Sequence, residues 1–248
     1  MLKSSNPALN KNVFANIERS TGETMTIQGA ANKSLILLVI LIFSASYTWQ
    51  QGLGSEEGLR SIMGWIMPLA IGGLIVAIVT MFKKQWAYIT APIYAVIQGL
   101  VLGAISLIME MKFPGIAMQA VGLTFGTFFM LLIAYKSRLI RATENFKLGV
   151  TAATCGIGLL YLVSFVLGMF GVRIPYIHES GLIGIGFSLF VVVIAALNLV
   201  MDFDFIESGA EHGAPKYMEW YGAFGLLITL VWLYIEILNL LAKLRGRE

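Results

Sequence analysis

Two apolar stretches that carry acids decide the fold: Asn198-Leu-Val-Met-Asp202-Phe-Asp204-Phe-Ile-Glu207 and Leu233-Tyr-Ile-Glu236-Ile-Leu-Asn239-Leu-Leu. Residues three or four positions apart share one face of a helix, so each stretch presents an acid and an amide on the same side. An ionised carboxylate at the centre of a bilayer helix costs about 2.5–3.5 kcal/mol, so it is expected to face other helices and to have a partner there. We therefore expect the rest of the chain to bury Asp202 and Glu236, with Asn198 and Asn239 as supporting polar groups.

The composition is that of a polytopic membrane protein. Of the 248 residues, 58% are hydrophobic and 12% are charged, and the mean hydropathy is +0.81, whereas soluble domains contain about 25% charged residues. At about 20 residues per span, this length accommodates seven helices and short loops. The sequence predicts an all-α fold, with a polar cytoplasmic segment over residues 1–32 and seven transmembrane helices over residues 33–248.

The positive charges predict the orientation. The predicted spans cover residues 33–49, 61–82, 86–109, 115–135, 148–170, 181–201 and 221–244. The segments on the N-terminal side contain eleven Lys and Arg residues and the opposite loops contain three, which predicts a cytoplasmic N-terminus. The net charge of +3 is a topology signal, and no nucleic-acid partner is expected.

The C-terminal tail disagrees with this orientation. A seventh full span places Lys243, Arg245 and Arg247 on the outside, whereas a re-entrant last segment would give a split of fourteen to three. The apolar run from Tyr221 is long enough to cross the membrane, so seven spans are favoured. The re-entrant alternative stays open.

Further polar and small residues lie within the predicted spans. Gln98 is expected to form a hydrogen bond between helices. Lys83 and Lys84 are expected to anchor the second span at the interface, with a smaller chance that one of them reaches an acid. The pairs Gly99/Gly103 and Gly122/Gly126 have the spacing of close helix packing. No nucleophile and base or metal-ligand constellation is present, so neither an enzyme nor a resident cofactor is expected.

The buried acids suggest an ion-handling site. Two carboxylates in one site of low dielectric constant cannot both ionise cheaply, so the pair would titrate as a unit. Oxygen ligands of this kind suit Ca²⁺ or H⁺ better than soft metals, which makes Asp202 and Glu236 the candidate ligands. An alternative is that Asp202, Asp204 and Glu207 mark the exit of the sixth span into water. That alternative is favoured for Asp204, which lies about 200° around the helix from Asp202, and for Glu207.

Both acidic motifs resemble those of the Bax inhibitor-1 family, and the similarity is greatest to its bacterial branch. Ala91-Pro-Ile-Tyr-Ala-Val-Ile-Gln-Gly99 and Met25-Thr-Ile-Gln-Gly-Ala-Ala-Asn-Lys33 add to the resemblance, which extends from Met25 onward. It implies seven helices with the last at the centre, and a pH-sensitive calcium leak gated by a pair of acids. The family's acids fall on Asp202 and on Glu236, where relatives usually carry Asp. The position of Gln98 corresponds to a further acid, and the family's basic partner falls on Lys83 or Lys84.

Two hypotheses of different classes follow. The first is a calcium leak channel of the bacterial inner (plasma) membrane, in which Asp202 and Glu236 form a proton-sensitive latch, Asp204 supports them, and Ca²⁺ and H⁺ are the transported or sensed ions. The alternative is a regulatory protein that binds a membrane-bound AAA+ protease through its N-terminal segment, Met1 to Thr24. Under both hypotheses the lipid bilayer surrounds the spans and is a partner of the protein.

Overall fold

The computed structural model describes residues 23–54, 56–171 and 181–246. These residues form seven long helices and one short 3₁₀ turn, η1 (Lys84–Trp86), and every long helix has the length and apolar composition needed to cross a membrane. This confirms the predicted all-α, seven-span fold. The helices are α2 (Ile27–Gly54), α3 (Glu56–Phe82), α4 (Ala87–Lys112), α5 (Ile116–Lys136), α6 (Glu144–Met169), α7 (Leu182–Glu211) and α8 (Met218–Arg245).

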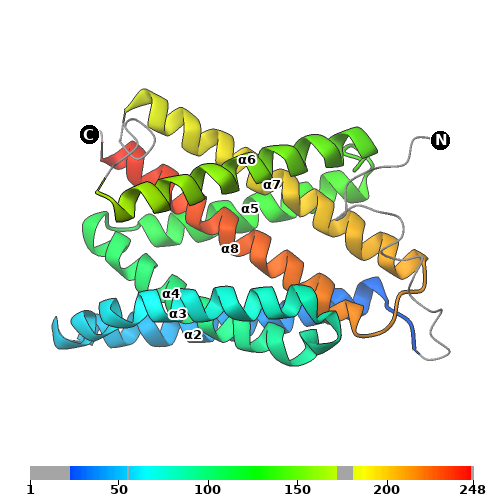
Figure 1. Cartoon of the computed structure of the whole chain (residues 1–248), viewed down its shortest axis with the longest axis horizontal. Coiled ribbons are helices and arrows are strands. Elements are labelled where there is room, and N and C mark those ends of the chain that lie inside the picture. The colour runs from blue at the N-terminus through cyan, green and yellow to red at the C-terminus, as the bar shows by residue number, and fades with distance from the viewer. Residues whose placement is uncertain (1–22, 55, 172–180, 247–248) are drawn as a thin grey trace.

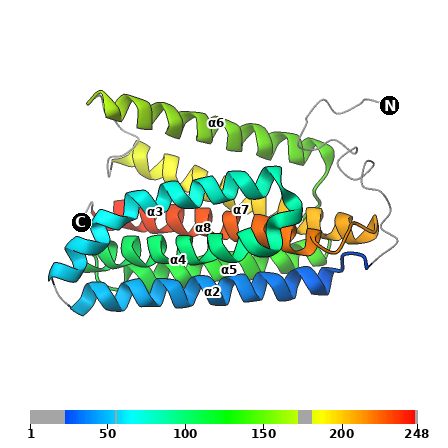
Figure 2. The same cartoon turned by 60° about the horizontal axis from the view of Figure 1, so that its bottom comes forward.

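Two groups of helices enclose α8 (Figure 1). In this view α2, α3 and α4 lie on one side and α5, α6 and α7 on the other, and the turned view shows α6 along one outer edge of the bundle and α2 along the opposite edge (Figure 2). Helix α8 packs against α2, α4, α5 and α7, and most of its residues are buried. The C-terminal helix is therefore central, as the family resemblance implied.

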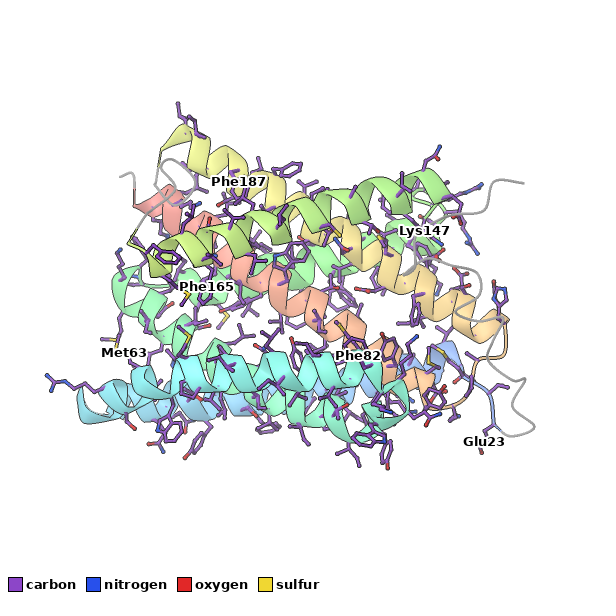
Figure 3. All side chains as sticks on the ribbon, viewed as in Figure 1. Glu23, Met63, Phe82, Lys147, Phe165 and Phe187 are labelled. Carbon is purple, nitrogen blue, oxygen red and sulfur yellow. The ribbon has the colours of Figure 1, made fainter. Side chains whose placement is uncertain are left out.

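The outer surface of the bundle is apolar. Met63, Phe82 and Phe165, which are labelled in Figure 3, are all more than half exposed. Helix α6 buries only Val150 and Ile157. A surface of this composition is suited to lipid and not to water.

Helix α7 continues ten residues beyond its predicted end at Met201 and reaches Glu211. Two of the acids that suggested an exit from the membrane form ion pairs: Asp204 with Lys147 of α6, and Glu207 with Arg138 of the loop between α5 and α6. Helix α2 likewise begins at Ile27, six residues before the predicted start at Lys33. Helix α4 runs unbroken through Pro92, as neighbouring helices often allow in membrane proteins.

The first and last helices define the two ends of the molecule. The backbone N–H of Met25 donates to the Ala214 carbonyl at 2.7 Å, which places the start of α2 beside the loop between α7 and α8. We call this the N-terminal end of the bundle. Helix α8 is one continuous helix from that end to the opposite one (Figure 1). The last segment is therefore a full-length helix and not a re-entrant one.

The two glycine pairs have different environments. A Cβ atom at Gly99 would lie 2.6 Å from the Cβ of Ser44, and one at Gly103 would lie 2.9 Å from the Cα of Ala45. These two glycines let α4 approach α2 closely, as predicted. At Gly122 and Gly126 a Cβ would meet nothing within 4 Å, so the prediction of a packing face there is wrong.

Candidate functional site

Glu236 lies in the central helix and is buried, with 3% of its surface exposed. Its Oε1 accepts hydrogen bonds from the hydroxyl of Tyr161 on α6 at 2.9 Å and from the indole N–H of Trp232 at 3.3 Å. Both donors are neutral. The carboxylate is therefore hydrogen-bonded by neutral side chains from α6 and from its own helix.

Asp202 faces α8 from α7. A Cβ atom at Gly225 would lie 3.7 Å from its Oδ1, and the carboxylate interacts with the side chain of Thr229. Its Oδ2 is buried and has no hydrogen-bond partner among the described residues. Buried polar atoms are nearly always hydrogen-bonded in folded proteins, so an orphan carboxylate oxygen requires an explanation.

The structure does not bring the two acids together. Asp202 is level with Gly225 and Thr229, and Thr229 precedes Glu236 by seven residues, which is roughly 10 Å along a helix at 1.5 Å per residue. The register between α7 and α8 thus places the carboxylates at different depths of the bundle. The predicted latch, in which they share a hydrogen bond, is absent from this structure.

The supporting amides are also separated. The Nδ2 of Asn198 donates to the Thr154 hydroxyl on α6 and to the Ile194 carbonyl, each at 2.8 Å. Asn198 therefore lies one turn from Asp202, as predicted, and joins α7 to α6. Asn239 is half-buried on α8. Gln98 lies at the interface of α3 and α4, where its Nε2 would be 3.0 Å from a Cβ at Gly73, away from both acids.

Two other acids of α7, Asp204 and Glu207, are ion-paired at the N-terminal end of the bundle. The Nζ of Lys147 lies 2.5 Å from Asp204 Oδ2, and Arg138 Nη2 lies 2.9 Å from Glu207 Oε1. Tyr135 also donates its hydroxyl to Glu207. Each carboxylate is about one quarter exposed, so these acids are paired with basic residues instead of being fully solvated. Asp204 does not support Asp202 directly.

The two lysines after α3 lie near the start of α8. The ammonium of Lys84 is 5.3 Å from the centre of the Tyr221 ring, and Lys83 is exposed. Neither lysine forms an ion pair with an acid in the part of the chain that the structure describes. Neither therefore contacts Asp202 or Glu236.

Sequence reasoning missed one buried acid, Glu219, which has no exposed surface. Its Oε1 accepts hydrogen bonds from the backbone N–H and the hydroxyl of Thr26, both at 2.9 Å. Its Oε2 pairs with Lys33 of α2, and Lys216 lies 3.4 Å from Oε1. The available signal was a charge at the start of each of two apolar segments, Lys33 and Glu219, but Glu219 lies just before the predicted span that begins at Tyr221 and was not considered buried.

A groove of about 560 Å³ opens between α2, α4, α5 and α8. Its walls are mostly aliphatic, and its polar groups include Ser106 and Tyr234, whose oxygens are 2.6 Å apart. Neither Asp202 nor Glu236 lines it. The groove is therefore separate from both of these acids, although a third carboxylate, that of Glu110, lines it.

The described residues contain no cluster of three or more His, Cys, Asp or Glu side chains that could hold a metal ion. Tight Ca²⁺ sites use six to eight oxygen ligands. Asp202 and Glu236 stand apart, each with hydroxyl or amide groups nearby. Such an arrangement suits brief contact with a passing cation better than tight storage.

Seven long apolar helices, with the C-terminal helix buried among the other six, define this chain as an all-α polytopic membrane protein. The family model described as Bax inhibitor 1 like matches residues 6–246. The chain therefore belongs to the Bax inhibitor-1-like family, and the resemblance noted in the sequence is confirmed. No curated protein and no solved structure matches the chain significantly.

The hypothesis of a protease regulator depends on Met1 to Thr24. Residues 1–22 lie outside those that the structure describes. The hypothesis stays a prediction.

Proposed function

We propose that this protein is a calcium leak pathway of the bacterial inner membrane, with a cytoplasmic N-terminus and with Asp202 and Glu236 along the ion route. The observation that carries the proposal is the buried Oδ2 of Asp202, which has no hydrogen-bond partner among the described residues. A carboxylate within a membrane bundle is costly and by default indicates a functional site. Within the described part of the chain Asp202 forms no ion pair that would offset this cost, in contrast to Asp204 with Lys147.

The positions of the acids favour stepwise passage. Asp202 contacts the first half of α8 and Glu236 lies in its second half, so a cation would meet one carboxylate at each of two depths. Conduction requires binding that is strong enough for entry and weak enough for release, and several weak sites in sequence meet this requirement. Carboxylate oxygens are hard ligands that suit Ca²⁺.

The leak is expected to depend on pH. A protonated carboxylate carries no charge and attracts a cation less, so Ca²⁺ flux should fall as the medium is acidified. Because the two acids are at separate depths, each contributes its own titration. Replacing one acid should remove its part of the pH dependence and leave the other part.

The test is Ca²⁺ flux into proteoliposomes from mildly acidic to mildly alkaline pH. Asp202→Asn and Glu236→Gln should each reduce flux severalfold at neutral pH and flatten the pH profile. Glu207→Gln is the matched control, because that acid is paired with Arg138 at the end of the bundle and lies outside the proposed route, and it should retain most of the flux. Wild-type flux no greater than that of protein-free liposomes, or an unaltered pH profile in both acid variants, would overturn the proposal.

A further inference from the structure

Helix α6 carries a polar stripe on one face. Lys147, Thr151, Thr154 and Tyr161 follow one another at intervals of four, three and seven residues, so all four lie on one side of the helix. Only Val150 and Ile157 of α6 are buried. The contact of α6 with the bundle therefore combines a row of polar groups with a small apolar cluster, in which Ile157 packs with Val191 and Ile194 of α7.

Three of these four residues meet a polar partner across the helix interface. Lys147 pairs with Asp204 at 2.5 Å, the Thr154 hydroxyl accepts from Asn198 at 2.8 Å, and the Tyr161 hydroxyl donates to Glu236 at 2.9 Å. Lys147 marks the N-terminal end of this row, on the same side of the molecule as Glu23 (Figure 3). We call the row of α6 residues and their partners the α6 seam.

The fourth residue, Thr151, leaves a gap in the pattern of contacts. Its hydroxyl is buried without a hydrogen-bond partner among the described residues, and so is Oδ2 of Asp202. Helices α6 and α7 are antiparallel neighbours. Thr151 lies between Lys147 and Thr154 on α6, and Asp202 lies between Asp204 and Asn198 on α7, so the two unpartnered groups lie at about the same height of the bundle. Asp202 points toward α8, and α8 also meets α6 through Glu236 and Tyr161, so this level belongs to the junction of α6, α7 and α8.

Helix packing alone does not explain why the oxygens of Thr151 and Asp202 are buried without partners among the described residues. Polar groups that hold membrane helices together do so by hydrogen-bonding each other, as Thr154 and Asn198 do. Two unpartnered oxygens at one level, one of them from a carboxylate, instead form a hard-oxygen site that a cation or its hydration water would satisfy.

We propose that the ion route runs along the α6 seam, with the Thr151 hydroxyl and the Asp202 carboxylate as its inner cation-binding level. The route rests on the proposed leak function and assigns α6 as one wall of the pathway. The Lys147–Asp204 ion pair closes the seam toward the N-terminal end, and the Tyr161–Glu236 hydrogen bond closes it toward the other end. Both contacts must part for an ion to pass.

Thiol labelling tests whether the seam admits water. The chain has a single cysteine, the exposed Cys155, so Cys155→Ala provides a cysteine-free background. Thr151→Cys and Thr154→Cys should react with a charged, water-soluble thiol reagent at least tenfold faster than Leu159→Cys, which is exposed on the outer face of α6. Modification of Thr151→Cys should also block Ca²⁺ flux.

A second pair of variants tests the hydroxyl itself. Thr151→Val keeps the shape of the side chain and removes its oxygen, so flux should fall severalfold, and Thr151→Ser should restore it. Thr80→Val is the matched control, because Thr80 is buried on α3 and its hydroxyl bonds to its own helix at the Val76 carbonyl. All variants are checked for a monodisperse elution profile and for wild-type thermal stability in detergent.

The results of these experiments distinguish a failure of the proposed α6 route from a failure of the proposed leak function. Wild-type flux together with unreactive seam cysteines and a fully active Thr151→Val overturns the route and leaves the leak function standing. Absence of wild-type flux overturns the leak function, and the route falls with it. Reactive seam cysteines, flux block by the reagent and rescue by serine together support the route.

Discussion

The buried carboxylates along α8 differ in how fully they are compensated. Glu219 pairs with Lys33 and accepts hydrogen bonds from Thr26, whereas Glu236 is hydrogen-bonded by neutral donors. Asp202 keeps an oxygen without a partner among the described residues. A fully compensated acid is best explained by a role in folding, and an uncompensated one by function. We therefore assign Glu219 to stability, whereas the unpartnered oxygen of Asp202 supports the proposed role in ion handling.

The role of Glu219 gives a prediction about stability. Removing one partner of a buried ion pair typically costs about 3–5 kcal/mol, because the other charge is left uncompensated. Glu219→Gln should therefore lower the unfolding temperature in detergent by several degrees and leave the pH profile of Ca²⁺ flux unchanged.

The control for this variant is Lys216→Met, since Lys216 is about half exposed and its contact should contribute little. Adding Lys33→Met to Glu219→Gln should recover part of the loss. A Glu219→Gln protein as stable as the wild type would contradict the assignment.

At the scale of helix pairs, α2 and α4 form the closest contact. Gly99 and Gly103 face the backbone and small side chains of α2, so the two helices approach without intervening side chains. Van der Waals packing of this kind drives association in lipid, where no hydrophobic effect acts between helices. Helix α6 is the opposite case, because it has little apolar burial and depends on the polar contacts of the α6 seam.

Alanine substitutions distinguish the two glycine pairs. Gly103→Ala places a methyl group against the backbone of Ala45, and such overpacking should cost about 1–3 kcal/mol. Gly126→Ala enters open space and should be neutral or slightly stabilising, because alanine is the better helix former. Thermal unfolding of both variants in the same detergent measures the difference. Equal stability of the two proteins would show that the close approach of α2 and α4 does not depend on Gly103.

At the scale of the whole molecule, two three-helix groups enclose a central helix that starts beside the beginning of α2 and ends at the opposite end of the bundle. The connections at the N-terminal end carry most of the positive charge, including Lys84, Arg138, Arg141 and Lys216. This distribution agrees with a cytoplasmic N-terminal end. With the proposed orientation, the last turn of α8, which contains Lys243 and Arg245, would face the outside.

This topology can be tested with single cysteines in the Cys155→Ala background. An impermeant thiol reagent added to intact cells should label Gly246→Cys and should not label Lys216→Cys until the membrane is opened. In a mixture of inside-out and right-side-out vesicles, both faces of the membrane are exposed, so the reagent should label both cysteines to the same extent. Labelling of both positions from the same side would mean that α8 does not cross the membrane.

The sequence by itself determined the number of spans, the interior position of the acids and the family. Hydropathy is a local property, and about 20 apolar residues must form a helix in lipid because no water can satisfy the backbone there. The same local argument placed Asp202 and Glu236 inside the bundle, since an acid facing lipid would be too costly. The acidic motifs were specific enough to indicate the Bax inhibitor-1-like family that the match confirms.

Only the tertiary structure decided which of these groups meet. The register between α7 and α8 separates Asp202 from Glu236, and the contact of α2 with the start of α8 joins Lys33 to Glu219 across 186 positions of the chain. The rotation of each helix also decided that Gly103 packs while Gly126 does not. Register and rotation depend on how side chains of distant segments interlock over the whole interface, so no single stretch of sequence contains them.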